Sequence, residues 1–152
     1  MKYFNSIDET LDFAIEQEQI AVDFYSKLAK SAKSNDLKKI FLDFVKEEMG
    51  HKLKLQKIKK EGIFSNENPK EVLDLKISDY LVSVKSSPDM TYQDTLIIAM
   101  KREKAAFKLY KNLAAMSPNE ELSVIFNNLA FEEANHKLQF ETEYDDLILK
   151  DN

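Results

Sequence analysis

Two stretches of the chain repeat each other: Ala14–Ala29 reads AIEQEQIAVDFYSKLA, and Ala99–Ala114 reads AMKREKAAFKLYKNLA. They align without a gap at an offset of 85 residues, the separation of Glu18 and Glu103. The same offset relates three further pairs: Phe41 with Phe126, Glu48 with Glu133, and His51 with His136. A repeat of this length indicates that one supersecondary unit, here a helical hairpin, occurs twice.

The composition favours helices over strands. Only two Gly and three Pro occur in 152 residues, which leaves little material for the many turns of a β fold. A chain of this length suffices for one core. We therefore predict one all-α domain over residues 1–152, a four-helix bundle made of two hairpins.

Capping signals place the helices near residues 6–31, 35–61, 91–115 and 118–148. Ser6 and Glu9 have the spacing of a capping box, and Thr91 begins a weaker one. Ser34 or Asn35 is expected to cap the second helix, and Pro118 to be the first residue of the fourth. Hairpin 1 then spans about 6–61 and hairpin 2 about 91–148.

The connection between the hairpins, about residues 62–90, is long enough to cross the length of a bundle. We expect one short helix after Asn68-Pro69 and another around Ser78–Val84. The apolar residues of this segment, Ile77, Tyr80, Leu81 and Val82, predict that it packs on the bundle or on a second subunit.

Charge and cysteine content exclude several classes of protein. The net charge is −5 and we expect no basic stripe that could neutralise phosphates, which argues against a nucleic-acid partner. The absence of cysteine excludes disulfides and thiolate metal sites. Apolar runs such as Leu96–Met100 are too short to span a bilayer, and the first residues lack an export signal. We expect a cytoplasmic protein without membrane contact.

Stepping three and four residues along each predicted helix gives a stripe that is apolar except at its middle. In the first and third helices the stripes are Ile7, Leu11, Ala14, Glu18, Ala21, Tyr25, Leu28 and Tyr92, Leu96, Ala99, Glu103, Ala106, Tyr110, Leu113. In the second and fourth they are Leu37, Phe41, Phe44, Glu48, His51, Leu55, Ile58 and Leu122, Phe126, Leu129, Glu133, His136, Phe140.

These central residues predict a metal site. Four buried glutamates at one level of an apolar core cannot all stay ionised unless cations neutralise them. In Glu48-x-x-His51 and Glu133-x-x-His136 both side chains project from one helix face. Carboxylates with one imidazole per metal suit iron or manganese. The predicted ligands of two metal ions are Glu18, Glu48, His51, Glu103, Glu133 and His136.

Other residues near the predicted site can be interpreted either as structural or as functional residues. Tyr25 and Tyr110 are expected to pack in the core, with a role beside the metals or in radical transfer as the alternative. Glu47 and Glu132 would each orient a histidine or be plain surface charge. Gly50, inside the second helix, lowers helix stability, and close helix packing is one explanation for it.

The full pattern, a glutamate on two helices and Glu-x-x-His on the other two, resembles the ferritin-like di-iron carboxylate proteins. The spacings Glu18 to Tyr25 and Glu103 to Tyr110 look most like the rubrerythrin group. The resemblance implies that Glu48 and Glu133 bridge two irons, which Glu18 with His51 and Glu103 with His136 complete. It also implies reduction of peroxide, or oxidation of Fe(II) by peroxide or oxygen.

Two departures from that group change the expectation. Typical rubrerythrins carry a rubredoxin domain with four cysteines, and this chain has none. A separate donor, such as a rubredoxin-like protein, would then supply electrons. Ala106 stands where rubrerythrins have an extra glutamate, which puts their redox-linked iron movement in doubt. The resemblance and the apolar connection together predict a homodimer.

Four functions remain open at this point. The leading prediction is a di-iron peroxidase or ferroxidase. A second enzyme class is a di-manganese catalase-like protein or a hydroxylase. The third is a non-catalytic iron-binding or iron-delivery protein. The fourth is a structural bundle without metal.

Overall fold

The structure is a computed structural model that describes residues 6–62, 80 and 91–151. Its described elements are the helices α1 (Ile7–Lys30), α2 (Asn35–Glu61), α4 (Tyr92–Met116) and α5 (Glu120–Asp151). The chain divides into two compact units, Phe4–Asp74 and Leu75–Asn152 with Met1–Tyr3. Each unit contains one of the predicted hairpins.

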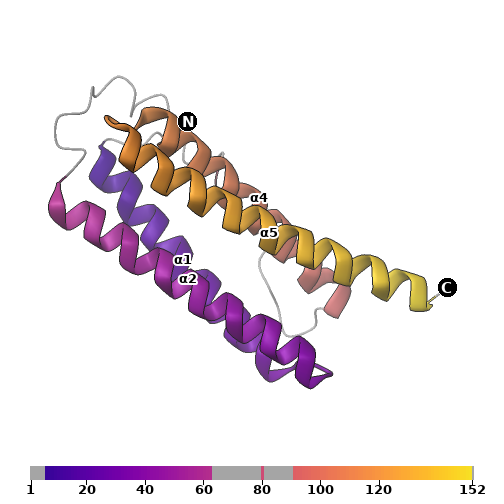
Figure 1. Cartoon of the computed structure of the whole chain (residues 1–152). Helices are drawn as coiled ribbons and strands as arrows, with labels where there is room; N and C mark the ends of the chain where they lie inside the picture. Colours follow the sequence, from indigo (N-terminus) through magenta and orange to yellow (C-terminus); the bar gives the residue numbers. More distant parts are fainter. Residues whose placement is uncertain (1–5, 63–79, 81–90, 152) are drawn as a thin grey trace. The chain divides into compact units, whose positions relative to one another are not determined.

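Hairpin 1 is the antiparallel pair of α1 and α2 (Figure 1). The Ser6 hydroxyl accepts a hydrogen bond from Glu9 N at 3.0 Å, and the Ser34 hydroxyl accepts one from Leu37 N at 3.1 Å. Ser34 therefore caps α2 by satisfying one of its orphan N–H groups. α2 ends at Gly62, whose φ of 62° is the left-handed conformation that glycine adopts without steric cost.

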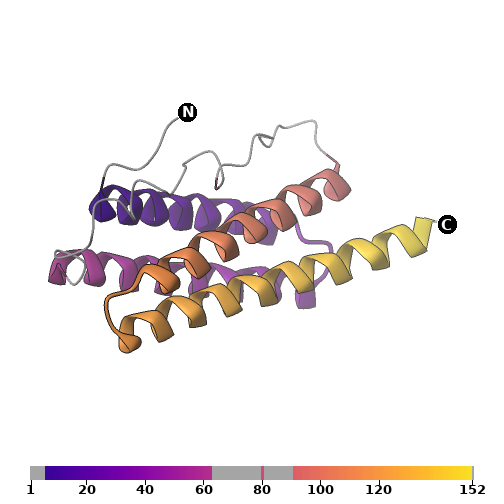
Figure 2. The same ribbon diagram turned by 90° about the horizontal axis from the view of Figure 1, so that it is seen from above.

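Hairpin 2 is the antiparallel pair of α4 and α5 (Figure 2). The Thr91 hydroxyl accepts a hydrogen bond from Asp94 N at 3.0 Å and caps α4 as predicted. α5 has 32 residues and α4 has 25, and the C-terminal end of α5 extends past the start of α4. Tyr80 is buried, and its hydroxyl accepts a hydrogen bond from Asn112 Nδ2 of α4 at 2.7 Å. One residue of the predicted connection thus packs on hairpin 2.

The start of the fourth helix differs from the prediction. α5 begins at Glu120 rather than at Pro118, because the Asn119 side chain is its cap. Asn119 Oδ1 accepts a hydrogen bond from Leu122 N at 2.8 Å. Ser117 instead ends α4, where its hydroxyl donates to the Leu113 carbonyl. The short helices predicted after Asn68-Pro69 and around Ser78–Val84 lie outside the described residues.

The buried faces are wider than the predicted stripes. Most stripe residues are buried, whereas Ala21, Leu37, Tyr92 and Ala106 are only partly covered. A second row is also buried at repeat-related positions, Phe24 with Leu109 and Ala29 with Ala114. The buried face of each hairpin helix is therefore broader than a single coiled-coil seam.

Close packing does not explain Gly50. A Cβ at this position would meet no heavy atom within 4 Å. Its repeat-related counterpart is Asn135, a residue with a full side chain. Nothing in the described structure requires a glycine there.

The cap of α5 gives a test of where this helix starts. Asn119→Ala should lower the free energy of unfolding by about 1 kcal/mol, because the Leu122 N–H loses its side-chain acceptor. The matched variant Ser117→Ala should have a smaller effect. Urea unfolding of both variants measures the difference. A larger loss for Ser117→Ala would mean that the helix begins at Pro118 after all.

Candidate metal centre

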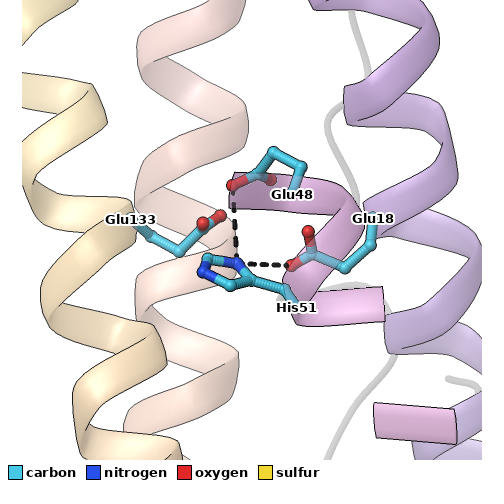
Figure 3. Close-up of side chains that lie close together, drawn as sticks. All are labelled: Glu18, Glu48, His51 and Glu133. Atoms are coloured by element: carbon cyan, nitrogen blue, oxygen red, sulfur yellow. Dashed lines mark ion pairs between the residues drawn. The ribbon is translucent and has the colours of Figure 1, made fainter. Parts of the chain in front are cut away.

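Hairpin 1 brings together Glu18 of α1 with Glu48 and His51 of α2 (Figure 3). His51 Nδ1 lies 3.5 Å from Glu18 Oε1 and 3.5 Å from Glu48 Oε1. All three side chains are buried, with Glu18 only 2% exposed. Glu48 and His51 are three residues apart, so one turn of α2 points both toward α1. We call these three residues triad 1. Glu133, also drawn in Figure 3, belongs to hairpin 2.

Hairpin 2 repeats this arrangement with Glu103 of α4 and Glu133 and His136 of α5, here called triad 2. His136 Nδ1 lies 3.7 Å from Glu103 Oε2 and 3.9 Å from Glu133 Oε1. These three side chains are also buried. Each hairpin therefore brings together two carboxylates and one imidazole, all predicted as ligands from the sequence.

The spacing within the triads fits metal ligands. Hydrogen bonds between such groups have lengths of about 2.9 Å, shorter than the separations seen here. Two ligand atoms that each lie about 2.1 Å from a metal are roughly 3.0 to 3.6 Å apart for common bond angles. The contacts of His51 fall within that range, and those of His136 lie just outside it. One ligand atom each of Glu18, Glu48 and His51 lies within 4.8 Å of the others.

The electrostatics of triad 1 also favour a cation. The pKa of Glu18 is raised from 4.5 to about 8, because burial and the neighbouring Glu48 raise it more than His51 lowers it. The charged carboxylate is thus unstable in this environment unless a positive charge compensates it. Because the donors are hard oxygens and one imidazole per triad, iron and manganese fit better than copper.

Aromatic rings pack beside both triads, as predicted for the two tyrosines. Tyr25 is buried and meets Phe44 edge to face, with 5.7 Å between ring centroids. Tyr110 is buried too but stacks on Phe126 at 6.4 Å with an interplanar angle of 20°. The Tyr25–Phe44 contact has no counterpart in hairpin 2, because Leu129 stands at the position related to Phe44 and has no ring. A role of either tyrosine in radical transfer stays a prediction.

The carboxylates that precede the motif glutamates are less buried than the ligands. Glu47 is exposed and Glu132 is partly buried. Exposure suits the interpretation as surface charge for Glu47. An orienting role toward a histidine stays a prediction for both residues.

Sequence reasoning missed the residues that follow the histidines. Lys52 Nζ donates a hydrogen bond to Gln19 Oε1 at 2.6 Å and so links α2 to α1 next to triad 1. The counterpart Lys137 instead forms an ion pair with Glu141, one turn further along α5. The repeat could have indicated the difference, because Gln19 aligns with Lys104, which cannot accept this bond.

Comparison with known proteins agrees with this site. The model of the rubrerythrin family matches residues 9–90 and 94–152. The chain belongs to the rubrerythrin family. No curated protein matches it significantly.

A solved structure from Thermotoga maritima, described as a ferritin-like diiron-carboxylate protein, has a similar fold. The TM-score is 0.75 at 22% sequence identity, and the match covers 95% of this chain and 97% of the other. The predicted all-α, ferritin-like four-helix fold of this rubrerythrin-family chain is therefore confirmed. None of its described helices has both the length and the apolarity of a membrane span.

The raised pKa of Glu18 predicts how the metal-free protein responds to pH. Folded protein holds the Glu18 proton up to about pH 8, whereas unfolded protein releases it near pH 4.5. The folded state thus binds more protons between these values, so the free energy of unfolding should fall as pH rises through this window. Urea unfolding in chelator at several pH values measures this slope.

Two variants isolate the contribution of Glu18. Glu18→Gln, which is neutral at every pH, should flatten the slope. Glu16→Gln changes an exposed glutamate of the same helix and should leave the slope as it is. An unchanged slope in Glu18→Gln would contradict the assignment.

Proposed function

We propose that triads 1 and 2 together hold two iron ions and that the chain is a di-iron oxidoreductase. Its reaction would be the reduction of peroxide, the oxidation of Fe(II), or both, with electrons from a separate donor protein. The observation that carries this proposal is the occurrence of one buried carboxylate–histidine triad in each hairpin, with the same composition and the same helix positions. Membership in the rubrerythrin family supports it.

The ligand roles in this proposal follow the family pattern. Glu18, Glu48 and His51 of hairpin 1 would hold the two ions together with Glu103, Glu133 and His136 of hairpin 2. Four carboxylates would balance the four positive charges of two divalent ions. Bound iron would supply two-electron redox chemistry, which none of the protein's own side chains provides.

The described residues contribute binding, orientation and exclusion of water. The ligand side chains are almost wholly buried, so few water molecules compete with them. In both triads the histidine Nδ1 atom faces two carboxylates, which sets the orientation of the ring. Glu18 has a raised pKa and holds a proton at neutral pH until a cation replaces it. Metal loading should therefore release protons.

Metal content and reaction with peroxide test the function directly. We expect about two irons per chain after anaerobic loading with Fe(II), and rapid oxidation of the loaded protein by hydrogen peroxide. Elemental analysis and stopped-flow absorption measure both. Two manganese ions in the purified protein would favour the catalase-like alternative. Iron that binds but reacts with neither peroxide nor oxygen would favour iron handling.

A variant pair tests whether triad 2 binds metal. Glu133→Gln removes one carboxylate of the triad and should reduce bound iron to roughly one per chain or less. The unfolding free energy of its metal-free form should stay the same or rise, because a buried charge is lost. Glu121→Gln changes an exposed glutamate of the same helix and serves as control. Equal iron content in both variants would exclude Glu133 as a ligand.

A homodimer and a cytoplasmic location stay predictions that accompany this proposal. The identity of the electron donor is part of the proposal as well. The surface of hairpin 2 indicates the charge of this donor protein and where it docks.

A further inference from the structure

A row of lysines runs along the outer face of α4, contrary to the expectation that the chain has no basic stripe. Its members are three and four residues apart, so they lie on one side of the helix. All are exposed, and they are Lys101, Lys104, Lys108 and Lys111. From Thr95 to Met116 the one acidic residue of α4 is the buried ligand Glu103. This face is therefore strongly basic in a chain whose net charge is −5.

The internal repeat shows that the fold itself does not require these lysines. The repeat-related positions of α1 hold a glutamate, a glutamine, an aspartate and a serine: Glu16, Gln19, Asp23 and Ser26. The buried positions of the two helices agree far better, with Glu18 aligned to Glu103 and Tyr25 to Tyr110. The outer face of α4 thus carries positive charge that the matching face of α1 lacks.

An apolar groove lies beside the lysine row. It has a volume of about 390 Å³ and is lined by Lys104, Phe107, Ala134, Lys137, Leu138 and Glu141. Exposed apolar side chains surround it: Phe131 is 65% exposed, and Leu138 is 61% exposed. Phe131 aligns with Lys46 of hairpin 1, so this apolar surface is also absent from the other repeat. An apolar centre with a charged rim is typical of protein–protein interfaces.

The groove lies close to triad 2. Three of its lining residues, Lys104, Ala134 and Lys137, follow the ligands Glu103, Glu133 and His136 by one residue in the chain. A protein bound in this groove would therefore be separated from the ligands by little more than one layer of side chains and helix backbone. Such a short separation is what electron transfer between two proteins requires.

We propose that the lysine row and the groove of hairpin 2 form the docking surface for a small acidic electron-transfer protein. This inference rests on the proposed function, because only a redox reaction requires such a partner. The positive row complements an acidic partner and speeds its approach. Phe107, Phe131 and Leu138 provide the apolar centre that holds it once it has arrived.

Binding of an acidic rubredoxin to the iron-loaded protein tests the surface without relying on turnover. Calorimetric titration with both proteins oxidised should show binding that weakens as salt rises. A basic cytochrome c, used as the opposite probe, should not bind. Stopped-flow reduction of the iron-loaded protein by reduced rubredoxin then gives the rate of electron transfer.

Charge reversal on the lysine row should abolish most of this binding. Lys104→Glu with Lys108→Glu should raise the Kd and lower the bimolecular reduction rate by about tenfold or more at low salt. The matched control is Lys54→Glu with Lys57→Glu, two exposed lysines of hairpin 1. Both double variants change the net charge equally, so a local effect appears as a difference between them. Equal losses in the two variants would overturn the proposal.

The apolar centre has a second matched pair. Leu138 and its repeat-related counterpart Leu53 are both 61% exposed. Leu138→Ala should raise the Kd several-fold, whereas Leu53→Ala should leave it unchanged. Identical effects would overturn the assignment of the groove.

Other outcomes separate this inference from the function on which it rests. Lysine-dependent binding without electron transfer would overturn the proposed redox function and leave the docking surface in place. Rapid reaction with peroxide, together with rubredoxin binding that none of these variants changes, would support the redox function and overturn the docking surface. Sedimentation of the same variants tests whether a second copy of this chain, rather than rubredoxin, binds to the groove. A changed monomer–dimer equilibrium with unchanged rubredoxin binding would assign the face to an interface between copies and overturn the proposal.

Discussion

In the buried face of each hairpin an imidazole nitrogen lies within about 4 Å of two carboxylates. An arrangement of this kind is costly in an apolar environment, because burial and like-charge repulsion both oppose ionisation. The raised pKa of Glu18 is the direct expression of that cost. The cost falls away when a cation takes the place of the proton, so the same contacts that destabilise the metal-free chain favour metal binding.

The two repeats have similar buried residues and different exposed residues. The ligands and the tyrosines occupy matching positions in both hairpins, since a change to a buried group affects both packing and charge. Outside, the repeats differ in sign: α1 carries Glu16 and Asp23 where α4 carries Lys101 and Lys108. Surface charge has little influence on stability, so it can diverge toward a partner. The two hairpins share the same buried triad and differ in the charge of their exposed faces.

The interiors of the two hairpins also differ where a single residue differs between the repeats. Tyr25 meets the edge of Phe44, whereas Tyr110 stacks on Phe126, because Leu129 replaces the phenylalanine in the second repeat. Lys52 links two helices through Gln19, whereas Lys137 pairs along its own helix with Glu141. The His51 contacts are also shorter than those of His136. The two triads are therefore alike in composition but not equal in environment.

The sequence alone determined the four described helices and predicted which residues gather in the two triads. Helical periodicity places residues three and four apart on one face, so the stripes suffice to identify Glu18, Glu48 and His51 and their repeats. Capping chemistry is equally local, which is why Ser34 marked the start of α2. The fourth helix was predicted to begin at Pro118, and only the hydrogen bond from Leu122 N to Asn119 Oδ1 showed that Asn119 is its cap. The width of the buried face, the open space around Gly50, the pKa of Glu18 and the groove close to triad 2 all came from the tertiary structure. Each depends on distances between side chains of different helices, which the periodicity of one helix does not specify.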